Sequence, residues 1–130
     1  LPSSPKAYQL DTELIDMANH NAPDTAEQIS DPVVAVDNAD IVYTDTWTSM
    51  GQELEAKKRR LAFSMYQIDY EILSLAKSDA LFMHPLPAHH GEEICDGILE
   101  SPQSVVFDQA ENRLHLQKAL LARMLLPAGS

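Results

Sequence analysis

Two short apolar segments, each followed at once by a polar residue, constrain the fold of this chain more than any other feature. Residues 39–44 form the first segment, which stops at Asp45, and residues 80–83 form the second, which stops at His84. Short runs of aliphatic and β-branched residues are typical of strands that lie buried in a parallel sheet. Because helix-forming stretches flank both segments, we predict an α/β fold with an open, mostly parallel sheet.

Capping residues predict where the helices begin. Asp31 followed by Pro32 is typical of a helix start, and Asp108 with Glu111 resembles a capping box, which predicts that the last helix starts at Asp108. Helices are thus predicted at residues 11–21, 31–36, 52–63 and 69–76 and from 108 onward, the last with an apolar stripe of Ala110, Leu114, Leu121 and Leu125. Their alternation with strands predicts a Rossmann-like arrangement with helices on both faces of the sheet.

The polar residues at the strand ends are the first candidates for a binding site. In open parallel sheets, ligands bind beyond the carboxyl ends of the strands. Asp45 and His84 are each the first polar residue after a predicted strand. We therefore expect both of them to border the site.

Composition limits the classes of function open to the chain. Its 130 residues, 45% of them hydrophobic, suffice for one globular domain or part of one. The net charge of −11 argues against a nucleic-acid partner, because phosphate contacts need clustered cations. No apolar run approaches the roughly 20 residues of a membrane-spanning helix, so we expect no membrane partner. Cys95 is the only cysteine, which excludes an internal disulfide and fits a reducing, cytoplasmic location.

The segment 44–53, Thr-Asp-Thr-Trp-Thr-Ser-Met-Gly-Gln-Glu, is the first candidate site. A carboxylate at a strand end, a hydroxyl and a glycine that lets the backbone approach a ligand suit a small amine or amino acid. An alternative is that Asp45 or Ser49 caps the next helix, and we expect Trp47 in the core. The segment resembles the ornithine-binding loop of ornithine carbamoyltransferases. This resemblance implies that Asp45 and Ser49 hold the amino group of ornithine and that the backbone at Met50 helps to bind it.

The segment 84–93, His-Pro-Leu-Pro-Ala-His-His-Gly-Glu-Glu, is the second candidate site. Its three histidines lie in a proline-bounded loop without a helically spaced carboxylate, so we expect no metal there. The segment resembles the His-Cys-Leu-Pro motif of the same family, which implies that Pro85 and Leu86 contact the carbamoyl group and the attacking amine, Leu86 through its carbonyl. Pro85 departs from the usual Cys and follows the aspartate branch of the family. It has neither a thiol nor a backbone donor.

Arg113 is the third candidate, in the segment Phe-Asp-Gln-Ala-Glu-Asn-Arg at residues 107–113. An arginine in the second turn of a helix is commonly a solvated charge. The segment is similar to the Phe-x-x-Ala-Glu-Asn-Arg segment of the family, which implies that Arg113 points at carbamoyl phosphate. A guanidinium suits this ligand because its fork of donors matches carbonyl and phosphate oxygens.

The resemblance also implies a reaction and an assembly. In this family the side-chain amine of L-ornithine attacks carbamoyl phosphate, giving L-citrulline and phosphate without a cofactor, in a homotrimer. The family's Ser-x-Arg-Thr-Arg loop and the first strands of its sheet have no counterpart in this sequence. We therefore interpret residues 1–130 as a partial ornithine-binding domain without the carbamoyl-phosphate-binding domain, inactive by itself.

Two alternatives follow from the proline at position 85. One is a non-catalytic domain that binds an amino acid or a partner protein. The other is a carbamoyltransferase with an altered amine substrate. Loss of the thiol at Pro85 is the feature that favours the non-catalytic domain, whereas the loop at residues 44–53 favours ornithine as the substrate.

Overall fold

Helices and strands alternate along the chain in the order that the hydrophobic pattern predicts. The computed structural model describes residues 3–125, so residues 1–2 and 126–130, the two ends of the predicted domain, lie outside the described part. The described elements are a 3-10 turn at Lys6–Tyr8, α1 at Thr12–Asn21, α2 at Pro32–Val36, β1 at Ile41–Tyr43, a 3-10 turn at Glu53–Glu55, α3 at Ala56–Phe63, α4 at Tyr70–Ser74, β2 at Leu81–Met83, a 3-10 turn at Ile98–Glu100, and α5 at Val106–Leu125.

Strands β1 and β2 pair in parallel, as predicted, with Val42 opposite Phe82. These two middle residues are buried, whereas Ile41 and Tyr43, which point to the other face of the sheet, are each 55% exposed. Successive side chains of a strand face opposite sides. One face of β1 therefore belongs to the core, and its other face is largely open.

A third segment joins the sheet beside β2. Ser104 forms a parallel bridge with Phe82, whose N–H donates to the carbonyl of Gln103 at 2.8 Å. Around Phe82 lies the hydrophobic core, which brings the strands together with α2, α4 and the loop before α5. Its buried members are Val36, Val42, Ile68, Leu73, Phe82, Ile94, Ile98, Leu99 and Val106.

Aspartate side chains begin several helices, because an acceptor at the position before a helix satisfies a free backbone N–H. Asp31 accepts from the N–H of Val33 at the start of α2, as the sequence predicts. Asp11 caps α1 in the same way. The longer helix predicted at residues 52–63 begins instead with the Glu53–Glu55 turn and becomes α-helical only at Ala56.

The last helix, α5, begins at Val106 and not at Asp108, which corrects the predicted capping box. The N–H of Val105 still donates to the Phe82 carbonyl at 3.0 Å, while its own carbonyl already accepts from the Gln109 N–H at 2.8 Å. Sheet pairing thus passes into helix at a single residue. Asp108 lies within the first turn, where its negative charge interacts favourably with the helix dipole and stabilises the helix.

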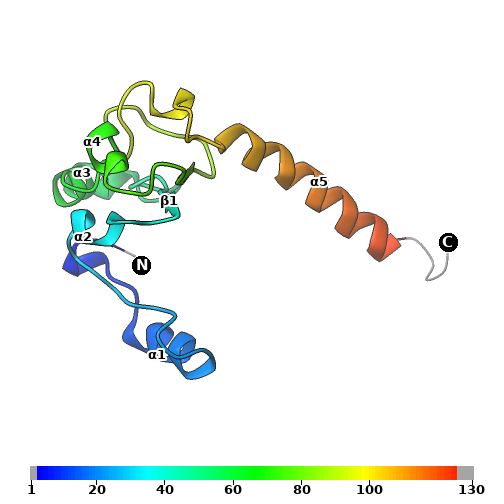
Figure 1. Ribbon diagram of the computed structural model, residues 1–130, viewed down its shortest axis with the longest axis horizontal. Coiled ribbons are helices and arrows are strands. Elements are labelled where there is room, and N and C mark those ends of the chain that lie inside the picture. Colours follow the sequence, from blue (N-terminus) through cyan, green and yellow to red (C-terminus); the bar gives the residue numbers. More distant parts are fainter. Residues whose placement is uncertain (1–2, 126–130) are drawn as a thin grey trace.

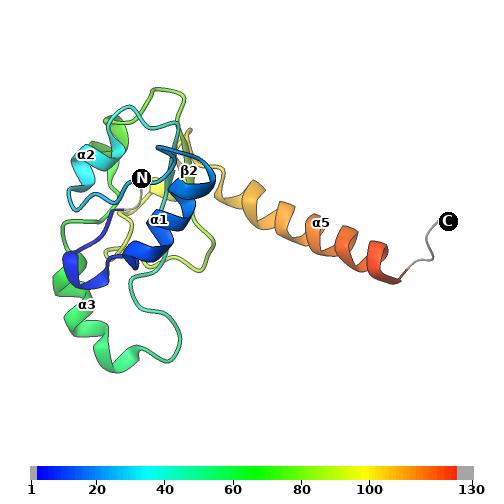
Figure 2. The ribbon, with the colours of Figure 1, turned by 90° about the horizontal axis from the view of Figure 1, so that it is seen from below.

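Helix α5 projects away from the rest of the chain (Figures 1 and 2). The predicted apolar stripe along it is exposed, since Leu114 is 58% exposed and Leu121 is 57% exposed. Its leucines therefore pack against no other described segment. None of the helices in residues 3–125 has the length and apolar character needed to cross a membrane.

Candidate functional site

The parallel pairing of β1 and β2 brings the first two candidate segments side by side. Tyr43 lies opposite Met83, and the N–H of Thr44 donates to the Met83 carbonyl at 3.2 Å. Asp45 and Pro85 each lie two residues beyond this last pair, on the loops that leave the two strands. Neighbouring strands lie roughly 4.8 Å apart. Two segments that are 40 residues apart in the sequence therefore begin at the same end of the sheet, where both strands have their carboxyl ends.

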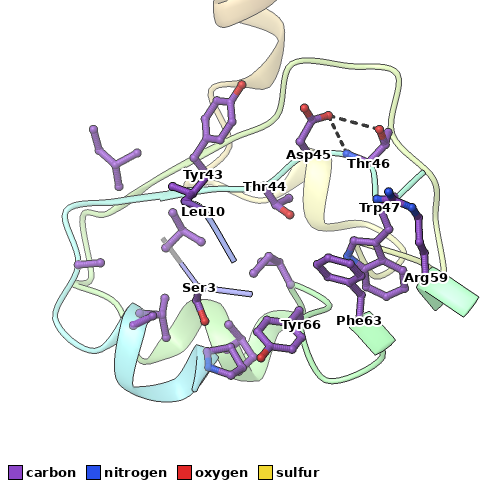
Figure 3. A pocket seen from close by; sticks show the side chains of 18 residues that line it. Ser3, Leu10, Tyr43, Thr44, Asp45, Thr46, Trp47, Arg59, Phe63 and Tyr66 are labelled. Carbon is purple, nitrogen blue, oxygen red and sulfur yellow. Dashed lines mark hydrogen bonds between the residues drawn. The ribbon is translucent and has the colours of Figure 1, made fainter. Parts of the chain in front are cut away.

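Asp45 is exposed on the loop that leaves β1. One carboxylate oxygen, Oδ1, accepts from the backbone N–H of Thr46 at 2.7 Å, and Figure 3 shows the carboxylate turned toward Thr46 and away from the aromatic side chains. In the described residues no hydrogen bond reaches the second oxygen, Oδ2. Asp45 therefore has a fixed orientation and a free acceptor.

Neither Asp45 nor Ser49 caps the next helix, which excludes the alternative role. The turn at Glu53–Glu55 follows Gln52, and no side chain caps it. The side chain of Gln52 instead accepts from the Ser49 N–H at 3.2 Å. Both Ser49 and Asp45 keep their side chains exposed, so they remain available to a ligand.

The rest of this loop is closed by its own side chains. Gly51 has a φ of 87°, a left-handed conformation that favours glycine, and its N–H donates to Glu53 at 2.9 Å. This hydrogen bond, followed by one from the N–H of Glu53 itself, lowers the pKa of the Glu53 carboxyl. The side chain of Met50 is 97% exposed and packs into no core.

Trp47 anchors the loop in the core, which confirms its predicted structural role. It is 8% exposed and stacks on Phe63 with ring centroids 6.0 Å apart. The guanidinium of Arg59 donates to the Trp47 carbonyl at 3.2 Å and lies 5.0 Å from the centre of the Tyr8 ring. Arg59 is a residue that sequence reasoning missed, because its only local signal is the ion pair with Glu55 one turn earlier.

A cavity of about 580 Å³ opens beside β1, next to these aromatic residues (Figure 3). Its volume suits a small molecule, for which sites of roughly 300–1,000 Å³ are usual. Its walls are largely apolar, however, and only Asp45 among the predicted site residues lines it. The other predicted site residues thus lie outside this cavity, namely Ser49, Met50, Pro85, Leu86 and Arg113.

The second segment leaves β2 through an unusual backbone. Leu86 has a φ of 54°, a left-handed conformation that costs a residue with a Cβ roughly 1–2 kcal/mol. Its N–H donates to the Nδ1 atom of the His84 ring at 2.9 Å. The peptide bond between Leu86 and Pro87 is cis. The contact with His84 Nδ1 thus fixes the direction of the Leu86 N–H within this loop.

Behind this loop lies a buried pair of ionisable side chains. His84 is 1% exposed and Glu93 is fully buried, with 3.2 Å between His84 Nε2 and Glu93 Oε1. Oε1 also accepts from the backbone N–H of His89 at 2.6 Å. His90 faces Asp96 instead, at 3.4 Å. The described residues contain no group of three or more His, Cys, Asp or Glu side chains suited to a metal ion.

Glu93 is ionised more readily than an ordinary glutamate. Burial by itself raises its pKa, but hydrogen bonds from the His84 ring and from the backbone N–H groups of His89 and Glu93 outweigh burial, so the pKa lies below its usual value. Glu93 is the last residue of the second candidate segment, and the sequence predicted no role for it. Nine positions separate it from His84, a spacing that matches no regular element.

We expect this lowered pKa to make stability depend on pH. Because the folded pKa lies below the unfolded one, the contribution of Glu93 is complete above pH ~4.3 and is lost as pH falls through the folded pKa. The substitution Glu93→Gln should therefore lower the free energy of unfolding by about 2 kcal/mol at neutral pH, and this difference should shrink in acid. Urea denaturation of both proteins between pH 3 and 7 measures it, and a difference that stays constant over this range would contradict the prediction.

Arg113 lies on α5, one turn beyond a residue that touches the second segment. The side chain of Gln109 accepts from the backbone N–H of His84 at 3.0 Å. Residues four apart share a face of a helix, so Arg113 extends from the same side as Gln109. Arg113 is exposed, and no ion pair in the described residues neutralises it. It is a free cation on the helix that starts at the strand ends.

Comparison with known proteins identifies the family. Residues 2–124 match the family described as aspartate/ornithine carbamoyltransferase, Asp/Orn binding domain. The ornithine carbamoyltransferase of Thermococcus kodakarensis is 50% identical over 126 residues, which cover 95% of this chain and 40% of that protein. The chain thus spans about 40% of the length of the curated relatives it matches.

Solved structures have the same fold. The ornithine carbamoyltransferase of Pyrococcus furiosus matches with a TM-score of 0.81 at 51% identity, covering 91% of this chain and 39% of that one. An anabolic ornithine carbamoyltransferase from Campylobacter jejuni matches with a TM-score of 0.83 at 35% identity, covering 92% of this chain and 41% of that one. The chain therefore belongs to the aspartate/ornithine carbamoyltransferase family, in which it corresponds to the Asp/Orn-binding domain.

Proposed function

We propose that this chain supplies the ornithine site of an enzyme that transfers the carbamoyl group of carbamoyl phosphate to the side-chain amine of L-ornithine. The products are L-citrulline and phosphate. The observation that carries the proposal is the parallel pairing of β1 and β2, whose carboxyl ends lead, at the same end of the sheet, into the loop of Asp45 and the loop of Pro85. An amino-acid ligand held by the first loop would then present its amine to the second.

Each candidate residue has a role that its surroundings support. Asp45 and Ser49 are exposed on one loop, where they would hold the amino group of ornithine together with the backbone at Met50. The carbonyl of Leu86 would accept a hydrogen bond from the attacking amine. Arg113, an exposed and unpaired cation in the described part of the chain, would stabilise charge on the oxygens of carbamoyl phosphate.

In the reaction a bond forms between the amine nitrogen and the carbonyl carbon, and the bond from that carbon to the bridging oxygen breaks with its electron pair leaving on phosphate. The nitrogen releases a proton, for which the departing phosphate is an acceptor. These residues contribute orientation and charge stabilisation.

The rest of the enzyme would come from outside these 130 residues. The chain covers about 40% of its curated relatives, and both the open face of β1 and the exposed leucines of α5 offer apolar surface for further contacts. We propose that a carbamoyl-phosphate-binding domain holds most of that substrate and that the active form is a cytoplasmic homotrimer.

A second candidate is a domain that binds an amino acid without catalysis, or one that serves another amine. The specific observation in its favour is Pro85, which leaves the reaction loop without a thiol and without a backbone donor.

Joining this chain to the carbamoyl-phosphate domain of a relative such as the Pyrococcus furiosus enzyme should yield citrulline from ornithine and carbamoyl phosphate. The chain alone should yield none, because it lacks most of the phosphate site. A joined protein that folds and forms trimers but turns over neither ornithine, aspartate nor putrescine would rule out the enzyme. In that case Pro85→Cys would separate a lost thiol from a wrong substrate.

A further inference from the structure

The backbone of Leu86 depends on one side chain for its conformation. Leu86 has a φ of 54°, which L residues rarely adopt, and its N–H points back at the residue two positions earlier, where His84 Nδ1 accepts it at 2.9 Å. The neighbouring Pro85 has no N–H to offer. The His84 ring is therefore the contact that orients the peptide group before Leu86.

This contact determines which nitrogen of His84 carries the proton. A nitrogen that accepts a hydrogen bond has no proton of its own, so the proton of the neutral ring lies on Nε2. Nε2 in turn lies 3.2 Å from Glu93 Oε1, where it donates. Glu93, a buried carboxylate, is thus the partner that selects the tautomer able to hold Leu86.

Glu93 also fixes the far end of the same loop. Oε1 accepts from the backbone N–H of His89 at 2.6 Å, and the ring of His89 lies 3.7 Å from Oε2. One buried carboxylate thereby connects residue 84, where the loop begins, with residue 89, where it ends. The peptide of Leu86 lies between these two anchors.

From these contacts we propose that His84 and Glu93 are positioning residues, which act as a buried pair to hold the loop that presents the carbonyl of Leu86 to the proposed transfer reaction. This inference rests on the proposed role of Leu86. Neither side chain needs to touch a substrate, because both act through the backbone of the loop.

The tautomer can be tested on the 130-residue chain itself, without any activity. Long-range proton-nitrogen NMR correlation of chain labelled with ¹⁵N-histidine distinguishes the two neutral forms, and the signal of His84 is assigned by its absence from His84→Gln. We expect the Nε2–H form for this residue at neutral pH. A ring protonated on Nδ1, or an averaged mixture of both forms, would overturn the inference, because Nδ1 would then be unable to accept from Leu86.

The joined enzyme tests the consequence for catalysis. Glu93→Gln keeps the size of the side chain but removes its charge, and we expect kcat to fall by about 10- to 100-fold, as for other small displacements of reacting groups, with KM for ornithine nearly unchanged. Glu92→Gln is the matched control. Its half-buried carboxylate pairs with the exposed Arg60 at 2.7 Å and contacts neither His84 nor Leu86, so we expect kcat to stay within about twofold, as for other pairs with an exposed partner.

These results separate the two proposals. If the joined wild-type protein makes no citrulline, the proposed function fails, while NMR still decides the geometry of the His84–Glu93 pair. If it makes citrulline and Glu93→Gln behaves like Glu92→Gln, the function stands and the positioning role is wrong. A loss that appears in the amount of folded protein or in KM, with kcat unchanged, would also contradict it.

Discussion

Replacing Asp45 with alanine in the joined enzyme should lower kcat/KM for ornithine by about 10³-fold, since removing one partner of a charge pair that a ligand buries costs ~4 kcal/mol. The carboxylate is exposed and held by Thr46 through one oxygen only, so its other oxygen is free for an ammonium group. Alanine removes this acceptor without disturbing the core. Steady-state kinetics with varied ornithine and saturating carbamoyl phosphate measures the loss.

The matched control for this substitution is Asp40→Ala. Asp40 lies just before β1, and its side chain is exposed and paired with Lys77 at 2.6 Å. Exposed ion pairs contribute about 0–1 kcal/mol, so kinetics should barely change. An Asp45→Ala enzyme that keeps its kcat/KM for ornithine would show that the amino acid binds elsewhere.

Replacing Arg113 with alanine should lower kcat by about 10²- to 10³-fold, which is the usual loss when one preorganised donor to a developing charge is removed. Arg113 is exposed on the face of α5 that also carries Gln109, whose side chain holds the backbone of His84. Arg113→Lys should recover only part of the activity, because an ammonium keeps the charge and loses the two-pronged geometry. Rates with varied carbamoyl phosphate measure both variants.

Arg123 provides the control on the same helix. It is exposed in the last turn of α5, far along the helix from the strand ends. Arg123→Ala should therefore leave kcat within about twofold, as expected for a surface charge away from the site. Equal losses from Arg113→Ala and Arg123→Ala would mean that the helix acts through its overall charge or its stability, and not through a specific contact.

Local patterns predicted much of the fold. The strands, the cap at Asp31 and the burial of Trp47 each depend on neighbouring residues, whose preferences are readable from the sequence. The predicted start of α5 was wrong because a contact between distant segments determines it. Asp108 and Glu111 have the spacing of a cap, but pairing of residues 103–105 with Phe82 determines where the chain leaves the sheet, and this contact spans more than 20 residues.

The candidate site divides in the same way. Asp45, Ser49 and Leu86 stay predictions as site residues, but their positions on loops after strands were predictable because a strand has a simple period. Arg59 and Glu93 were not found. Arg59 donates to the Trp47 carbonyl, which is 12 residues earlier in the sequence. Glu93 bonds to His84 across nine residues, a spacing that no regular element has.

The two short apolar segments thus determined by themselves that this protein has parallel strands with polar residues at their ends, since side-chain burial follows from local hydrophobicity. Only the tertiary structure decided that Tyr43 pairs with Met83, that the Glu93 carboxylate lies behind the loop of Leu86, and that α5 extends with its leucines exposed. Register, buried hydrogen bonds and helix direction depend on contacts between distant segments. Such contacts leave no periodic signal in the order of the residues.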